Sequence, residues 1–156
     1  MKKSGLIHLC LLGLLSTALV FTSCNKNDDE GTSQLKVHLT DGPADYDAVL
    51  IDVQEIEIHS DANGWQTFNI LHPGIYNLLD FNNGLDTLIA DATLPSGQIS
   101  QMRLILGPNN SVIVNGTTYP LATPSAQQSG LKFNIQQQLD PGAVYHIGID
   151  FDAGKS

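Results

Sequence analysis

The stretch from Ala48 to His59 constrains the fold most strongly, because apolar and polar residues take turns along nearly all of it. Successive side chains of a β-strand point to opposite faces, so such alternation predicts a strand with one buried face. The alternation shifts by one residue near Gln54 and Glu55, and a β-bulge there would keep the apolar set on one side. That apolar set is Val49, Ile51, Val53, Ile56 and Ile58. We therefore predict one long, bent strand lying across a hydrophobic core.

Shorter stretches of the same alternation follow, separated by turn residues such as Asn63-Gly64 and Asn115-Gly116. About eight or nine short strands and at most one short helix besides a signal peptide indicate an all-β fold, an antiparallel sandwich of two sheets. Residues Tyr76 to Ala90 fit neither the strand nor the helix period, and we interpret them as a crossover with one helical turn after Leu85. The clearest strands are Leu35–Thr40, Trp65–Phe68, Gln98–Leu106, Ser111–Val114, Thr117–Leu121, Leu131–Gln136 and Tyr145–Asp152.

The amino terminus has the layout of a secretory signal peptide over residues 1–23. Lys2 and Lys3 precede an interrupted apolar run from Leu6 to Phe21, which is too short and broken for a confident membrane span. The segment Phe21-Thr22-Ser23-Cys24 resembles a bacterial lipobox, with Phe21 where Leu is commonest. This resemblance implies cleavage before Cys24, attachment of diacylglycerol to its sulfur (palmitate among the lipid chains) and stable membrane attachment.

Residues 24–34 are predicted to be the acylated cysteine and a flexible, acidic tether, because they are polar and contain Gly, Ser and Thr. Within them, Lys26-Asn27-Asp28-Asp29-Glu30 resembles the signal that sends Bacteroidota-type lipoproteins to the cell surface. We therefore predict an outer-membrane, surface-exposed protein; the alternative is a lipoprotein facing the periplasm. Removing residues 1–23 takes away two lysines and no acid, which changes the formal net charge from −9 to −11. Such a chain repels phosphate backbones, so no nucleic-acid partner is predicted.

An ordered set of short segments gives the body of the chain, residues 35–156, a family resemblance. The segments are Leu39-Thr40-Asp41-Gly42-Pro43-Ala44, Tyr46-Asp47-Ala48-Val49, Gly64-Trp65, Leu94-Pro95-Ser96-Gly97-Gln98-Ile99, Pro124-Ser125, Ser129-Gly130-Leu131-Lys132 and Asp150-Phe151-Asp152-Ala153. Together they resemble the lipoprotein family called domain of unknown function 4382. The resemblance implies a β-sandwich of immunoglobulin-like or transthyretin-like kind and no established activity. Because members of that family usually continue with a further strand, we also expect a domain that lacks its final strand and exposes an edge.

Two groups of side chains are candidates for metal binding. Five aspartates would converge if the ends of two strands meet, and carboxylate oxygens suit Ca²⁺; the alternative is that they cap turns or are solvated. These are Asp41, Asp45, Asp47, Asp150 and Asp152. His38, His59 and His146 lie on polar faces of predicted strands without zinc-ligand spacing, so we expect exposed histidines rather than a zinc site. No cofactor other than this candidate Ca²⁺ is predicted.

Aromatic residues offer a candidate sugar-stacking surface made of Trp65, Tyr119 and Tyr145, against the alternative that they pack in or around the core. Asp86-Thr87-Leu88 resembles a short acceptor sequence for O-glycosylation, which would modify Thr87. We find no catalytic constellation in the sequence, so an enzyme is not predicted.

The leading hypothesis is therefore a lipid-anchored, non-catalytic module for binding, adhesion or assembly with a protein or glycan partner. It would act through an open sheet edge or through the loops Asp41–Asp47 and Ala122–Gly130. The alternatives are a carbohydrate-binding module with structural Ca²⁺ and a hydrolase.

Overall fold

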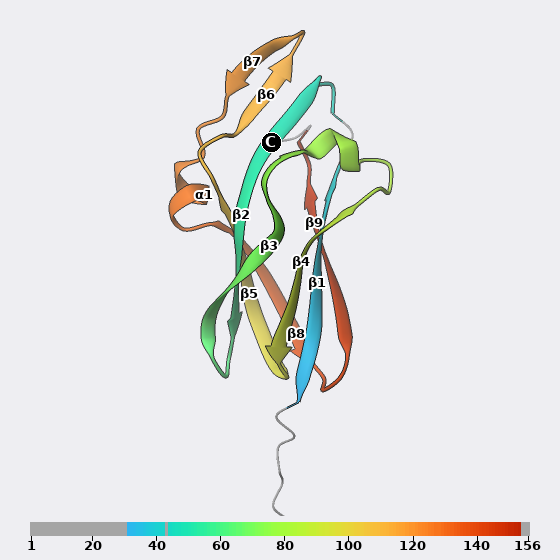
Figure 1. Cartoon of the computed structure of the whole chain (residues 1–156), viewed down its shortest axis with the longest axis vertical. Helices are drawn as coiled ribbons and strands as arrows, with labels where there is room; N and C mark the ends of the chain where they lie inside the picture. The colour runs from blue at the N-terminus through green and yellow to red at the C-terminus, as the bar shows by residue number, and fades with distance from the viewer. Residues whose placement is uncertain (1–30, 43, 154–156) are drawn as a thin grey trace, which may run out of the picture.

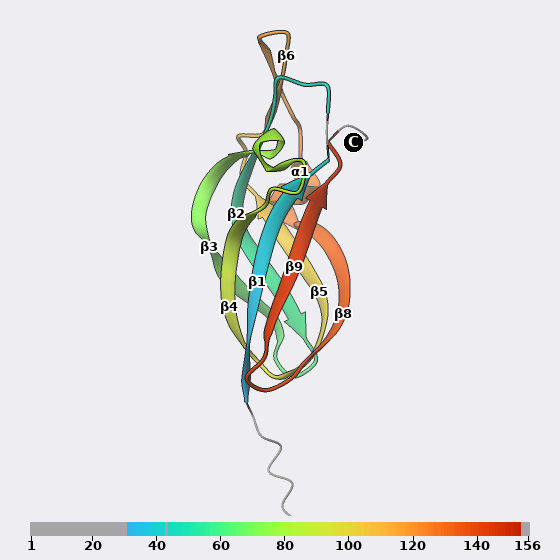
Figure 2. The ribbon, with the colours of Figure 1, turned by 90° about the vertical axis from the view of Figure 1, so that its right-hand side faces the viewer.

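The computed structural model describes residues 31–42 and 44–153, which form two β-sheets packed face to face (Figures 1 and 2). The all-β, two-sheet sandwich predicted from the alternation is confirmed. The predicted signal peptide, Cys24 and most of the tether lie outside the described residues. The first strand begins at Thr32 rather than at Leu35, so the last residues assigned to the tether belong to the sandwich.

The larger sheet has six strands. Five of them follow the order β7-β6-β2-β5-β8, and β3 pairs with the edge of β2 opposite to the edge that pairs with β5 and β6. β2 is the predicted long strand, and it pairs with β3, β5 and β6. The predicted bulge is confirmed, because the pairing of β2 with both β3 and β5 shifts between Val53 and Glu55. The bounds are β2 Ala48–Ser60, β3 Gly64–Asn77, β5 Gly97–Leu106, β6 Ser111–Val114, β7 Thr117–Pro120 and β8 Leu131–Leu139.

The smaller sheet has three strands in the order β4-β1-β9, namely β4 Thr87–Pro95, β1 Thr32–Asp41 and β9 Val144–Phe151. β1 and β9 are parallel, unlike the antiparallel pairing predicted throughout. The physical reason is the connection before β9. The strand β8 belongs to the other sheet, so the turn after it carries the chain across the sandwich, and β9 then runs beside β1 in the same direction (Figure 2).

The crossover predicted for Tyr76 to Ala90 was only partly right. Tyr76 and Asn77 end β3, and the helical turn that follows is a short 3-10 helix, η1 Leu78–Phe81, which lies before Leu85 rather than after it. The end of the crossover is the start of β4, which the sequence interpretation missed. The pairing of β1 with β4 shifts so that Ile89 and Ala90 are both buried, and this second bulge breaks the alternation that would have revealed the strand.

Two further local features were not predicted from the sequence. One short α-helix, α1 Pro124–Gln128, lies within the loop Ala122–Gly130, in addition to the 3-10 turn η1. The other is a bulge within β3 that includes Pro73, because Val53 pairs with Gly74 and Glu55 with Asn69.

The core lies between the sheets, where apolar residues from both inner faces interdigitate. Among the described residues, those that form this core lie between positions 35 and 153. The most buried large side chains are Leu35, Leu39, Ile56, Ile58, Leu78, Ile89, Leu94, Ile99, Met102, Leu104 and Leu139.

Replacing Gly107 with Ala is predicted to lower the free energy of unfolding by about 1–3 kcal/mol, as overpacking a tight site does. A Cβ at this position would overlap the carboxylate of Asp52. That carboxylate is buried and accepts hydrogen bonds from the Asn109 backbone N–H (3.2 Å) and side-chain Nδ2 (2.9 Å), so it cannot swing aside freely. Urea denaturation measures the difference.

Gly148→Ala is the matched control for this substitution. A Cβ at Gly148 meets no atom within 4 Å, and we expect the stability to stay the same or rise slightly. Equal losses in the two variants would contradict a specific clash with Asp52.

Candidate functional site

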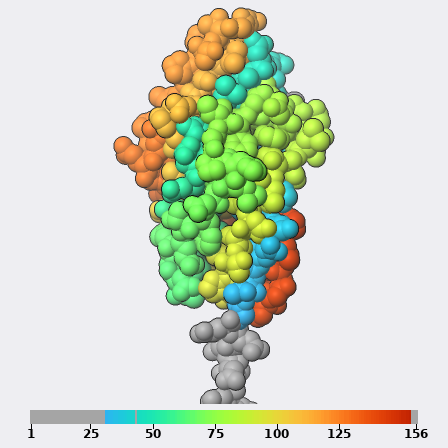
Figure 3. Space-filling model, in the orientation of Figure 1, coloured from blue at the N-terminus to red at the C-terminus, as the bar shows by residue number. Residues whose placement is uncertain are grey.

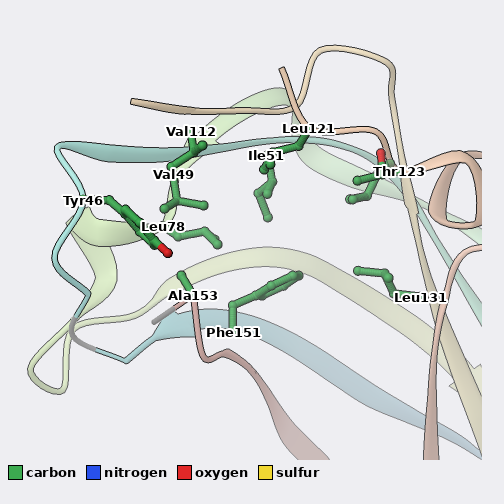
Figure 4. A pocket seen from close by; sticks show the side chains of 11 residues that line it. Tyr46, Val49, Ile51, Leu78, Val112, Leu121, Thr123, Leu131, Phe151 and Ala153 are labelled. Carbon is green, nitrogen blue, oxygen red and sulfur yellow. The ribbon is translucent and has the colours of Figure 1, made fainter. Parts of the chain in front are cut away.

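An apolar cavity of about 320 Å³ lies between the two sheets at one end of the sandwich and is partly open to solvent (Figure 4). Both sheets and the loops at that end contribute to its wall. Volumes of about 300–1,000 Å³ are typical of small-molecule sites, so the cavity is large enough for a small ligand. Its lining is Tyr46, Val49, Ile51, Leu78, Leu106, Val112, Leu121, Thr123, Leu131, Phe151 and Ala153.

Two hydroxyl groups interrupt this apolar lining. Tyr46 comes from the segment between β1 and β2, and Figure 4 shows its hydroxyl among the side chains near Leu78 and Ala153. Thr123 lies on the other side, where its Oγ1 accepts hydrogen bonds from Asn110 Nδ2 (2.9 Å) and Gln127 Nε2 (3.2 Å). The cavity can therefore hold an apolar body and offer a hydrogen bond at its edge.

A buried polar cluster holds the wall of the cavity around Thr123. Asn110 accepts a hydrogen bond from the Asp52 backbone N–H (2.9 Å) and donates to the Gly107 carbonyl (2.7 Å). Its backbone carbonyl also accepts from the Leu121 N–H (2.8 Å). These bonds join β2, the loop after β5 and the segment before α1. The sequence interpretation missed this role, since Gly107-Pro108-Asn109-Asn110 has only the composition of a turn.

The five aspartates proposed as calcium ligands do not gather at one point. Asp47 Oδ2 accepts from the Gly116 N–H (2.7 Å), Asp45 is exposed, and Asp150 is exposed on β9. Asp41 is buried and its Oδ1 accepts from the Ala153 N–H (3.1 Å), which holds the end of β9 against the cavity. Asp152 lies beside Gly42. Within residues 31–42 and 44–153, no group of three or more His, Cys, Asp or Glu side chains is arranged to hold a metal ion.

The three candidate aromatic contacts do not share a surface. Trp65 lies on the outer face of the larger sheet, where the Arg103 guanidinium stacks at 3.6 Å from its ring centroid and His59 packs edge-on. Tyr119 is exposed on β7, at the opposite end of the sandwich from the β2–β3 turn (Figure 1). Tyr145 packs against the core, and its hydroxyl donates to Asp140 (3.3 Å). A continuous stacking platform of these three residues is therefore not present.

The remaining candidates lie apart from the cavity. Thr87 is half-buried at the start of β4, and its O-glycosylation stays a prediction. Tyr76 donates a hydrogen bond to the His72 carbonyl (2.7 Å), and partial burial raises the pKa of its hydroxyl above the ordinary 10.0. His38 and His146, expected to be exposed histidines without zinc-ligand spacing, are in contact through Nε2 and Nδ1 (3.0 Å).

The fold and its cavity define an all-β sandwich protein with an apolar chamber between its sheets. A family model described as a domain of unknown function (DUF4382) matches residues 32–156, and the chain belongs to that family. The resemblance seen in the sequence is thus confirmed. No curated protein matches the chain.

Among solved structures, the chain is similar to a leucine-rich repeat protein from Bacteroides thetaiotaomicron VPI-5482, at 18% sequence identity. The similar part covers 79% of this chain and 12% of that protein's chain, with a TM-score of 0.33. In the part of the chain that the structure describes, no helix has the length and apolar character needed to cross a membrane.

Proposed function

We propose that this protein is a lipid-anchored, non-catalytic binding module that captures a small, mostly apolar molecule in the cavity between its sheets. The observation that carries the proposal is the cavity itself, about 320 Å³ in volume and lined almost entirely by apolar side chains. A water-filled apolar cavity favours an apolar occupant, because removing apolar surface from water is favourable. The hydroxyl of Tyr46 supplies a polar contact that orients the molecule.

The position of the cavity supports capture from the side facing away from the membrane. β1 begins at Thr32 at one end of the sandwich, and the β6–β7 hairpin stands at the other (Figure 3). The cavity is lined by residues that follow β1, begin β2 and end β9. A ten-residue strand is about 30 Å long, so the cavity opens roughly that far from the attachment point of a tether ending at Thr32.

A fluorescence titration tests the capture of an apolar molecule. The measurement uses residues 25–156, which include all the described residues of the core and lack the proposed lipidated cysteine, so no detergent is needed. We expect the neutral probe N-phenyl-1-naphthylamine to become fluorescent on binding and to saturate at one molecule per chain. Mass spectrometry of the protein purified from its own membrane would then identify a natural occupant. The absence of saturable binding would refute the proposal.

Replacing Cys24 with Ala is predicted to release the protein from the membrane fraction, since the proposed anchor is the lipid on this sulfur. Cell fractionation measures how the wild-type and Cys24→Ala proteins divide between the membrane fraction and the soluble fraction. Digestion of intact cells with an added protease separates surface exposure from a periplasmic orientation, because only surface-exposed chains are cleaved. A Cys24→Ala protein that stays with the membrane would contradict the lipid anchor.

Glycan binding on the outer face of the larger sheet is a second candidate function. It is favoured by one observation: Trp65 is 36% exposed on a face that also carries Gln101 and Asn134, which contact each other at 3.3 Å. An indole ring next to amide groups is suited to a sugar, whose faces are apolar and whose edges are polar. A glycan array comparing the wild-type protein with Trp65→Ala tests it, and the absence of any Trp65-dependent signal would refute it.

A further inference from the structure

His38 and His146 are brought together by the parallel pairing of β1 and β9. In this register Lys36 is opposite His146 and His38 is opposite Gly148, so the two imidazoles are diagonal neighbours on the outer face of the smaller sheet. His38 Nε2 and His146 Nδ1 are 3.0 Å apart. The ring centroids are 5.2 Å apart, which indicates that these nitrogens face each other and share one proton in a hydrogen bond.

Asp86 fixes the other nitrogen of His38. Its Oδ1 lies 3.2 Å from His38 Nδ1, so Nδ1 carries a proton that it donates to the carboxylate. In the neutral ring this places the lone pair on Nε2, the nitrogen that faces His146. Metal-ligating histidines nearly always donate their second ring N–H to a carboxylate, a carbonyl or water, and such a partner makes the ligand nitrogen more basic. His38 thus has the arrangement of a metal ligand supported by a carboxylate.

The spacing of the two nitrogens also suits a single ion. Nitrogens bound at about 2.05 Å and 3.0 Å apart would subtend about 94° at the ion, near the right angle of tetragonal Cu²⁺ or Ni²⁺ sites. Both rings must turn so that their lone pairs converge. His146 is exposed and His38 is 21% exposed, so the turn takes place at the surface.

The surroundings leave room for an ion and its water ligands. A Cβ built at Gly148, the residue opposite His38, meets nothing within 4 Å, so the space beside the imidazoles is open. The charge of Asp86 attracts a cation, and that of Lys36, across from His146, opposes it. The site would have two protein ligands, with water in the other positions. It is therefore smaller than a metal-binding group of three or more His, Cys, Asp or Glu residues, none of which is present among the described residues.

We propose that His38 and His146 form a two-histidine site for a divalent transition-metal ion such as Cu²⁺ or Ni²⁺, with Asp86 orienting His38. Binding replaces the hydrogen bond between the rings. His146 changes to the tautomer protonated at Nε2, which frees the lone pair of its Nδ1 for the ion.

Calorimetric titration of the full, untagged chain in detergent with Cu²⁺, and separately with Ni²⁺, tests the proposal. We expect one site per chain, and His146→Ala should weaken it at least about tenfold, while the folded state is retained because His146 is exposed. The matched control is His72→Ala, which removes an exposed histidine from β3 in the other sheet and should leave the affinity unchanged. Asp86→Asn should weaken binding about tenfold, as loss of a carboxylate partner does.

Nuclear magnetic resonance locates the ion independently of affinity. Paramagnetic Cu²⁺ should broaden the resonances of His38, His146 and Gly148 before those of His59 and His72. Wild-type affinity in His146→Ala, or broadening centred on another histidine, would overturn the proposal. Unchanged binding in Asp86→Asn would overturn the role given to that carboxylate.

Discussion

Replacing Val112 with Trp is expected to weaken the binding of an apolar probe by at least about tenfold, because the indole would occupy part of the cavity that the ligand requires. Val112 lies on β6 and its side chain lines the cavity (Figure 4). Val112 is half-buried, so the larger ring can turn partly toward solvent, and the loss in the free energy of unfolding should be at most about 3 kcal/mol. Titration with N-phenyl-1-naphthylamine measures the loss, and circular dichroism checks that the sandwich is retained.

The neighbouring substitution Ile113→Trp is the matched control. It adds the same ring on the same strand, but successive side chains point to opposite faces and Ile113 does not line the cavity. We expect wild-type affinity in this variant. Equal binding by Val112→Trp and the wild-type protein would place the probe elsewhere, and loss in both variants would point to a disturbed fold rather than to a filled cavity.

Replacing Ile56 with Ala is expected to lower the free energy of unfolding by about 3 kcal/mol, within the range for large-to-small changes in a core. Ile56 lies on β2 directly after the bulge, and its side chain is 0% exposed. It pairs with Phe68 on one side and Leu104 on the other, so truncation leaves a cavity between three strands. Urea denaturation followed by tryptophan fluorescence gives the midpoint, and an unchanged slope shows that the effect is on stability.

Ile75→Ala separates burial from the chemistry of the substitution. Ile75 lies on β3 and is 56% exposed, so the same truncation should change the stability by about 0.5 kcal/mol or less. A similar loss in the two variants would contradict the assignment of Ile56 to the centre of the core.

Sequence reasoning worked best where a feature depends on adjacent residues. The bulge in β2 was visible because the alternation shifts at Gln54 and Glu55, and the pairing shifts at the same place. The β6–β7 turn followed from Asn115-Gly116, and both residues have positive φ in the structure. The strand β4 escaped because its own bulge at Ile89 breaks the same pattern that revealed the others.

The candidate sites depend on residues that are distant in the sequence, and sequence reasoning did not predict them. Tyr46 and Thr123 belong to loops that the sequence marked as binding segments, yet nothing local shows that both border one cavity. The aspartates near the same end were expected to converge, but Asp41 and Asp47 each accept a backbone N–H instead. Hydrogen-bond partners of this kind are chosen by loop geometry, which residue spacing does not reveal.

Alone, the order of residues determined that this chain forms strands, where most of them bend and turn, and which side chains face inward, because these properties follow from neighbours along the backbone. Only the tertiary structure decided that β9 lies parallel to β1, that His38 meets His146, and that the two sheets leave a cavity at one end. Those features depend on which strands become neighbours. That choice is made by the packing of distant segments against each other, and no local pattern encodes it.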